Sequence, residues 1–189
     1  VVLAARNGEE LARVAGEFAA MGYSVDVLAF DLCDEQAVIA AIPEIVRRHG
    51  RLDILVNNAG VCLWSGLQDS TLDDWNKTLM INLTSVYLLC REAALVMVEQ
   101  RAGRIINVSS YVATVGRERL QAYVASKHGV TGLTKSLAGE LGRHNVTVNG
   151  IAPGLFLTKM AEPVTQDAQR MAIFTNAIAM GRWGKPEEL

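Results

Sequence analysis

Hydrophobic and polar positions alternate along this chain in a pattern that predicts strands separated by helices. Five short runs have the length and composition of buried strands: Val1–Ala5, Val25–Phe30, Ile54–Asn57, Arg104–Ser109 and Val146–Ile151. Between them, the pattern predicts helices in Glu9–Met21, Glu35–Arg48, a long stretch within Thr71–Arg101, and roughly Gln121–Arg143. Unbroken apolar strands joined by helices are typical of a parallel sheet that is covered on both faces. We therefore expect a single α/β domain of three layers, α/β/α, around a doubly wound parallel sheet.

The strand ends indicate where a ligand would bind. In doubly wound sheets, ligands lie beyond the carboxyl ends of the strands. The segments that follow the predicted strands should therefore line one crevice: Ala5-Arg6, Asp31, Asn57–Gly60, Ser109-Ser110 and Pro153-Gly154.

Composition narrows the class of protein. The chain has 189 residues, is 50% hydrophobic and carries a formal charge of −2, which suits one globular domain. The balanced charge and the lack of a long basic run argue against nucleic acid or a membrane surface as partner, and we see no signal peptide or long apolar span. A small-molecule substrate is expected instead.

Cysteine and histidine usage excludes two further kinds of site. The three cysteines, Cys33, Cys62 and Cys90, are widely spaced and form no Cys-x-x-Cys, so neither a disulfide framework nor a zinc site is indicated. The histidines lack ligand spacing, and no metal is expected. These features favour a reducing compartment, the cytoplasm.

Tyr123 and Lys127 form the first candidate catalytic pair. They stand four residues apart on a predicted helix, which places the phenol and the ammonium on one face. A cation roughly 4 Å away, at an effective dielectric of about 20, would contribute about 4 kcal/mol, or roughly three pKa units, toward ionising a phenol. Such a tyrosine could act as a general acid or base. Since about one chain in ten would show this spacing by chance, the pair alone is weak evidence.

Other motifs accompany the pair and make it specific. Asn57-Asn58-Ala59-Gly60 follows one predicted strand, Asn82 begins an Asn-x-x-Ser within the long helix, and Asn107-Val108-Ser109-Ser110 ends another strand. Thirteen residues after Ser110 comes Tyr123-Val-Ala-Ser-Lys127. Across essentially the whole chain, this set resembles the short-chain dehydrogenase/reductase family, and it implies a Rossmann-like fold and an NAD(P)-dependent oxidoreductase.

The resemblance implies a role for each catalytic residue. Ser110 would hydrogen-bond the substrate oxygen, and Tyr123 would exchange a proton with it. Lys127 would lower the tyrosine pKa and hold the nicotinamide ribose, while Asn82 would anchor the water that links Lys127 to solvent. Ser109 is a rival for Ser110, but the family's separation of thirteen residues from the tyrosine selects Ser110. In isolation, Ser110 could be a turn or cap residue and Asn82 a helix-surface amide.

The resemblance also implies the cofactor contacts. Asp31, followed by Leu32, would meet the adenine, although Asp31 could also cap the helix that follows. Gly60 belongs to the turn Asn58-Ala59-Gly60, whose backbone a cofactor could approach closely, although a plain loop glycine is the alternative for Gly60. The expected contacts on the nicotinamide side are Asn58, Ala59, Gly60, Tyr123, Lys127, Pro153, Gly154, Phe156 and Thr158, with Thr158 reaching the carboxamide.

The end of the first run bears on the choice of cofactor. Relatives that use NAD present an acidic residue there, whereas this chain has Ala5 followed by Arg6. An arginine can bind the 2′-phosphate of NADP through two parallel hydrogen bonds, which a carboxylate would repel. NADP(H) is therefore expected, with NAD(H) possible if Arg6 is only a solvated charge.

Family members open with a strand and a glycine-rich Thr-Gly-x-x-x-Gly-x-Gly turn that this chain lacks. We therefore expect residues 1–189 to form a partial NAD(P)-binding domain, which begins at the second strand and ends before the last helix and strand. The missing strand would lie between Val1–Ala5 and Ile54–Asn57 and would leave a gap in the sheet.

The substrate and the assembly are less determined. The chain resembles gluconate 5-dehydrogenases and 3-oxoacyl-carrier-protein reductases about equally, so a sugar acid and a 3-oxoacyl thioester both remain open. Arg101 could meet an acidic carrier, or it could be a solvated helix end. A catalytically silent cofactor-binding scaffold of the same fold is the alternative to an enzyme. We expect a homodimer or homotetramer through the two long helices, whose apolar residues exceed one stripe: Val86, Leu88, Leu89, Leu95, Val96 and Val98.

Overall fold

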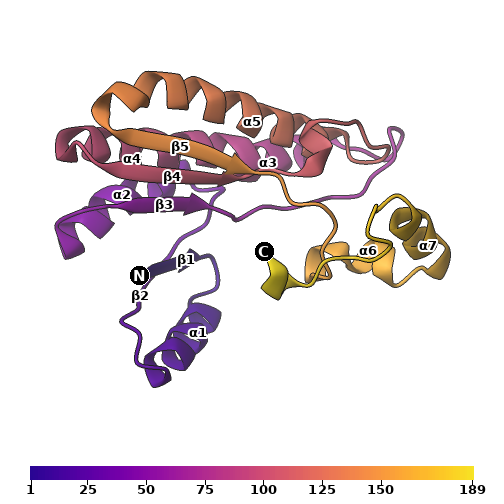
Figure 1. The fold of residues 1–189 in the computed structure, drawn as a ribbon, viewed down its shortest axis with the longest axis horizontal. Coiled ribbons are helices and arrows are strands. Elements are labelled where there is room, and N and C mark those ends of the chain that lie inside the picture. Colours follow the sequence, from indigo (N-terminus) through magenta and orange to yellow (C-terminus); the bar gives the residue numbers. More distant parts are fainter.

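A computed structural model describes all of residues 1–189, and its strands form two parallel sheets (Figure 1). Strand β1 (Val2–Ala5) pairs with β2 (Asp26–Ala29). The second sheet has the order β3-β4-β5, with β3 at Ile54–Asn57, β4 at Gly103–Val108 and β5 at Val146–Ile151. All five strands agree with the prediction to within one or two residues. No hydrogen-bonded pairing joins β1 to β3, and this break lies where we expected the gap.

The four predicted helices are present, and the longest is interrupted. They are α1 (Gly8–Ala20), α2 (Glu35–His49), α3 (Leu72–Leu79) continuing into α4 (Ser85–Gln100), and α5 (Gln121–Leu141). A π-helical turn, Met80–Thr84, separates α3 from α4. The sequence pattern missed two short helices near the end of the chain, α6 (Glu162–Thr165) and α7 (Ala168–Asn176).

Local capping explains where several helices begin and end. The Asn7 side chain accepts the N–H groups of the first turn of α1, and Asp34 does the same for Ala37 of α2 at 3.1 Å. The alternative role of Asp31 as a helix cap is therefore wrong, because its carboxylate instead accepts the N–H of Cys33 at 2.9 Å. Helix α2 ends at Gly50, whose left-handed φ of 77° suits a residue without a Cβ.

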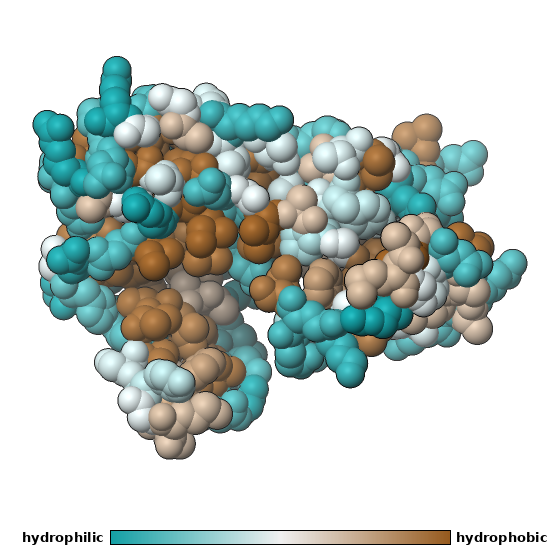
Figure 2. Space-filling model, in the orientation of Figure 1, coloured by the Kyte–Doolittle hydropathy of each residue, from teal (hydrophilic) through white to brown (hydrophobic).

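The main core lies between the β3-β4-β5 sheet and helices α2, α4 and α5. Its fully buried members include Ile42 of α2, Met97 of α4, Ile105 of β4 and Val146 of β5. Figure 1 shows α1 on the opposite side of the strands from α4 and α5. The expected cover on both faces is only partial, because α1 packs against β1 and β2 and leaves Ile54 and Val56 of β3 exposed. Figure 2 shows apolar surface on both sides of the space between the two sheets.

One helical run corrects the expectation that the chain has no long apolar span. Residues Leu72–Gln100 are long and apolar enough to cross a membrane by length and composition, but half of the most apolar window is buried inside the protein. Its inner residues, such as Cys90, Ala93 and Met97, belong to the main core. The buried half of this run therefore packs within the domain.

Candidate active site

Tyr123 and Lys127 lie one turn apart near the start of α5, as the sequence predicts. The Lys127 ammonium is 5.7 Å from the centre of the Tyr123 ring, and only 4% of Lys127 is exposed. Its Nζ donates a hydrogen bond to the Val108 carbonyl at the end of β4, at 2.8 Å. The lysine is thus held between α5 and the carboxyl end of a central strand, with its charge facing the tyrosine.

The ionisation of this pair differs from the expectation. Burial raises the pKa of Tyr123 to about 12, and the Ser110 hydroxyl beside it opposes the shift only in part. Burial also lowers the pKa of Lys127 to about 8. The expected lowering of the tyrosine pKa by Lys127 is therefore not seen, because desolvation of the phenolate is the largest influence on it and the ammonium is bonded to the Val108 carbonyl rather than to the phenol. At neutral pH the phenol keeps its proton and can donate it.

The two serines at the end of β4 have different surroundings. Ser109 Oγ donates to the Lys127 carbonyl at 3.1 Å and contacts the Thr131 hydroxyl at 2.9 Å, so it is engaged by the backbone and side chains of α5. Ser110 starts a 3₁₀ turn, where its Oγ accepts only a long bond of 3.4 Å from the Val112 N–H. This geometry supports Ser110, rather than Ser109, as the hydroxyl available to a substrate.

Asn82 lies in the π-helical turn and is fully buried, so its interpretation as a helix-surface amide is wrong. Its Nδ2 donates to the Val61 carbonyl and its Oδ1 accepts the Val61 N–H, both at 2.8 Å. The Nδ2 also contacts Ser126 Oγ at 3.2 Å. A π-helical turn is a frequent device for directing a side chain into a functional site. Here the turn points the amide at the loop after β3 and fixes that loop against α5.

Gly60 lies in this loop, beside two of the candidate catalytic groups. A Cβ added to Gly60 would be 3.3 Å from Asn82 Oδ1 and 3.7 Å from Lys127 Nζ. The position therefore lacks room for a side chain without a shift of Asn82, which is a stronger reason for glycine than an ordinary loop provides.

A buried polar network that the sequence reasoning missed fixes the ends of β3 and β4. Asn57 and Asn107 are register partners, and Asn57 Nδ2 donates to Asn107 Oδ1 at 2.9 Å. Asn107 Nδ2 in turn donates to Thr134 Oγ1 of α5 at 2.9 Å. The signal was available in the sequence, because both asparagines sit at strand ends within the motifs. This network holds the loops that carry Gly60 and Ser110 at a fixed separation.

The predicted contacts for the far end of the cofactor lie at the carboxyl ends of β1 and β2. Arg6 and Asp31 approach to 3.9 Å, and 75% of the Arg6 side chain is exposed. Leu32 is half-buried, whereas Asn58 and Ala59 are exposed at the end of β3. These residues can be reached by a bound molecule, and Arg6 keeps most of its guanidinium free.

The predicted closing loop is connected to the serine segment. The Pro153 carbonyl accepts the Tyr111 N–H at 3.0 Å. The Phe156 ring packs on Gly184, where a Cβ would come within 2.6 Å of it, so part of its surface is used within the protein. Gly154 and Thr158 are exposed. The structure thus brings this loop to the same end of the sheet as Ser110.

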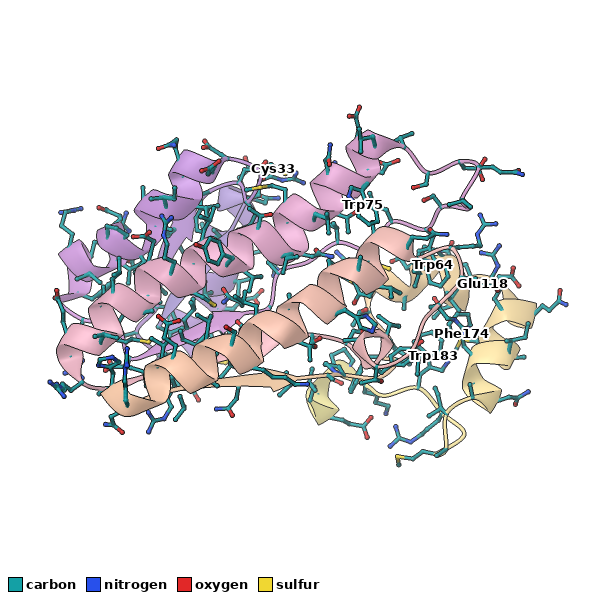
Figure 3. All side chains as sticks on the ribbon, turned by 90° about the horizontal axis from the view of Figure 1, so that it is seen from above. Cys33, Trp64, Trp75, Glu118, Phe174 and Trp183 are labelled. Atoms are coloured by element: carbon teal, nitrogen blue, oxygen red, sulfur yellow. The ribbon has the colours of Figure 1, made fainter.

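Sequence reasoning also missed a second group of side chains beside the site. Cys62 follows the Gly60 loop, and burial raises the pKa of its thiol to about 11, so it stays neutral. Trp64 packs edge-on against Phe174 of α7, with ring centres 6.0 Å apart, and Phe174 also contacts Trp183 at 6.2 Å. Figure 3 shows these three aromatic residues together near one end of α5. Trp64 lies in the loop after β3, and that position was the available signal, whereas Phe174 lies on α7.

Comparison with known proteins gives consistent matches along the chain. The family described as short chain dehydrogenase matches residues 1–169. Gluconate 5-dehydrogenase of Gluconobacter oxydans (strain 621H) is 35% identical over 189 residues, which cover 100% of this chain and 74% of that protein. The 3-oxoacyl-acyl-carrier-protein reductase FabG of Thermotoga maritima is 37% identical over 165 residues, or 87% of this chain and 66% of that protein.

Solved structures agree with the sequence matches. A gluconate 5-dehydrogenase from Burkholderia cenocepacia J2315, in complex with NADP and tartrate, superposes with a TM-score of 0.93 at 34% identity, covering 97% of this chain and 72% of that one. A crystal structure of NAD+-bound xylitol dehydrogenase is also similar, with a TM-score of 0.91 at 27% identity, covering 97% of this chain and 76% of that one. The chain spans roughly two thirds to three quarters of the length of these four proteins.

Proposed function

Because the chain belongs to the short-chain dehydrogenase family of NAD(P)-dependent oxidoreductases, we propose that the protein moves a hydride between NADP(H) and a ketone or secondary alcohol. The observation that carries this proposal is the convergence of Ser110, Tyr123 and Lys127 at the carboxyl end of β4. Ser110 comes from the turn after β4, and Tyr123 and Lys127 come from α5. All three side chains are largely buried where these elements meet. A silent scaffold would have no need to hold them there.

The proposed chemistry follows from what each group can do. When bound, the nicotinamide supplies or accepts the hydride at the substrate carbon. Ser110 donates a hydrogen bond to the substrate oxygen. Tyr123 gives its proton to that oxygen during reduction and takes it back during oxidation. Lys127, whose pKa of about 8 keeps it cationic at neutral pH, would hold the nicotinamide ribose beside the phenol.

The chain's residues fit a nicotinamide cofactor. Lys127 is buried with one backbone partner and retains two N–H donors for a ribose hydroxyl. Asn58 and Ala59 are exposed beside Gly60, where a ligand can approach the backbone. Arg6 is mostly exposed and only loosely paired with Asp31, so its guanidinium can receive a 2′-phosphate. This supports NADP(H) over NAD(H).

Two substrate classes remain in the proposal, and one observation orders them. Arg101, the residue that favoured an acidic carrier, closes α4 in a left-handed conformation with φ of 53°, and its carbonyl accepts the Asn145 amide at 3.0 Å. Arg101 therefore has a structural role at the end of α4 that requires no partner protein. We place a sugar acid first and a 3-oxoacyl thioester second.

A steady-state assay tests the function. The complete protein is supplied with NADPH and, in separate reactions, with 5-keto-D-gluconate or an acetoacetyl thioester. We expect NADPH oxidation with 5-keto-D-gluconate. Turnover of the thioester alone would reverse the order of substrates, and turnover of neither would support the scaffold alternative.

We further propose that a second copy packs on the long helices. Val86 and Leu88, which we expected at an interface, are buried in this chain's own core, whereas 46% of Tyr87 and 62% of Leu95 are exposed. They line a groove of about 510 Å³ between α4 and α5 that also holds Arg91, Glu99, Glu140 and Arg143. Charges of both signs around an apolar centre suit an isologous dimer, in which the same patch meets itself. Sedimentation of the complete protein as a monomer would contradict this.

The three free cysteines agree with a reducing compartment, the cytoplasm.

A further inference from the structure

Arg117 lies in the segment between Ser110 and Tyr123 and has no ionic partner. It belongs to none of the ion pairs in the structure, although the acidic residue Glu118 follows it directly. Its side chain is half-buried rather than extended into solvent. A partly desolvated guanidinium without a carboxylate is uncommon, because burial of an unpaired charge costs free energy.

The guanidinium is held in place by an aromatic platform. Its central carbon lies 3.9 Å above the centre of the Phe174 ring, which is a close cation–π contact. Phe174 is itself fixed by Trp64 and Trp183, and Trp183 donates to Thr175 Oγ1 at 3.0 Å. The stacked face leaves the N–H groups at the guanidinium edge free to donate.

Three separate segments meet at this point. Trp64 comes from the loop after β3, Arg117 from the loop after β4, and Phe174 from α7. The first two loops are joined by a hydrogen bond from the Ser65 N–H to the Arg119 carbonyl, at 3.1 Å. Figure 3 shows Trp64, Phe174 and Trp183 close to Glu118, the neighbour of Arg117. The cation is therefore built into the rim of the candidate active site.

Tyr111 links the rim to the catalytic pair. It follows Ser110 directly and is half-buried. Burial raises the pKa of its phenol, and the Arg117 charge opposes that shift, while Tyr111 in turn affects Tyr123. Tyr111 thus lies within electrostatic range of both Arg117 and Tyr123.

From this geometry we propose that Arg117, stacked on Phe174, binds the carboxylate of the substrate and selects an acidic hydroxy or keto acid over its neutral analogue. A planar guanidinium fits a carboxylate through two parallel hydrogen bonds. The platform restricts the arginine before the ligand arrives, which lowers the entropy lost on binding. The proposal rests on the proposed function, because it assigns the specificity of that same site.

D-gluconate and D-gluconamide are a matched pair that tests this specificity, since they differ only in the carboxylate. Oxidation of each by the complete protein with NADP+ gives kcat/KM, and calorimetry in the Tyr123→Phe background with NADP+ gives binding without turnover. We expect Arg117→Gln to reduce the preference for gluconate by about tenfold or more, mainly through KM. The preference of Arg117→Lys for gluconate should lie between those of the wild type and Arg117→Gln, because an ammonium keeps the charge and loses the bidentate geometry.

Two variants serve as controls. Phe174→Leu keeps an apolar side chain but removes the platform, and should weaken the preference by a few-fold. Arg119→Gln removes an exposed arginine from the same loop and should leave the preference unchanged, which excludes a general effect of charge. Thermal melting of each variant establishes that it is folded.

The two measurements separate this inference from the proposed function. If gluconate binds more tightly than gluconamide and Arg117→Gln removes the difference, the inference stands even without turnover, in which case only the proposed function fails. The inference is overturned if the Tyr123→Phe protein with Arg117 intact does not bind gluconate or shows no preference for it over gluconamide, or if that preference survives when Arg117→Gln is added.

Discussion

The body of the molecule, which comprises β3, β4, β5, helices α2, α3, α4 and α5 and the turns between them, differs sharply from the outer unit formed by β1, α1 and β2. The body contains the main core and all the candidate catalytic residues. In the outer unit only Leu11 is buried, and its candidate cofactor residue Arg6 is 75% exposed. Proton transfer depends on fixed geometry, which burial provides. Cofactor choice requires a charge that a ligand can reach, and the exposed outer unit provides that charge.

The comparison predicts its largest effect at Tyr123. Tyr123→Phe removes the proton donor but no apolar contact, so kcat should fall by about 10²–10⁴ while the affinity for NADPH stays within a few-fold. Steady-state kinetics and a fluorescence titration with NADPH measure both. Tyr23→Phe, on an exposed tyrosine beyond α1, should change neither. Retained turnover in Tyr123→Phe would show that Tyr123 does not supply the proton and would contradict the catalytic role of the body.

Two glycines of α5 test how strongly the body depends on close packing. A Cβ at Gly129 would come within 2.7 Å of Leu83 in the π-helical turn, whereas a Cβ at Gly132 would meet nothing within 4 Å. Gly129→Ala should therefore lower the free energy of unfolding by about 1–3 kcal/mol and reduce activity, because it displaces the turn that holds Asn82.

Gly132→Ala is the matched control for that change. It should raise the free energy of unfolding by about 0.5–1 kcal/mol, since alanine favours a helix over glycine. Denaturant unfolding of both variants measures the difference. Equal effects would mean that contact between α5 and the π-helical turn does not constrain the site.

Lys127 gives the body a dependence on pH that the outer unit should lack. Its pKa falls from an ordinary 10.5 to about 8 in the folded protein. Between these values the unfolded chain holds a proton that the folded protein releases, so the contribution of Lys127 to the free energy of unfolding should rise with pH from about 8 to 10.5. The buried thiols of Cys62 and Cys90, whose pKa values are raised to about 11, contribute an opposite change above about pH 9 that is common to wild type and variant. Lys127→Met should lose this rise, about 2 kcal/mol between pH 7.5 and 9.5. Parallel pH curves for the two proteins would indicate that Lys127 is not desolvated.

The same contrast explains what the sequence could predict. Strands and long helices follow from apolar periodicity, and the positions of Asn82, Ser110, Tyr123 and Lys127 follow from motifs at strand ends and on helices. The tyrosine pKa did not follow, because four-residue spacing gives proximity to Lys127 but says nothing of the burial that dominates the shift.

Features that depend on contacts between distant segments were also missed. The π-helical turn arises within a continuous apolar pattern, and α7 is short, with Phe174 as its one buried residue. The platform beneath Arg117 combines three segments that lie far apart in the sequence, so no local pattern could indicate it.

The central claim, that the body performs the chemistry while the outer unit selects the cofactor, is tested most directly by combining Arg6→Asp with Ser110→Ala in the complete protein. The measured quantity is the ratio of kcat/KM for NADPH to that for NADH, in the wild type, both single variants and the double variant. Ser110→Ala should lower both values alike, by about tenfold or more. Arg6→Asp should shift the ratio toward NADH by about tenfold, by the same factor with or without Ser110. A ratio that changes with Ser110→Ala, or that Arg6→Asp leaves unchanged, would contradict the division of tasks between the two regions.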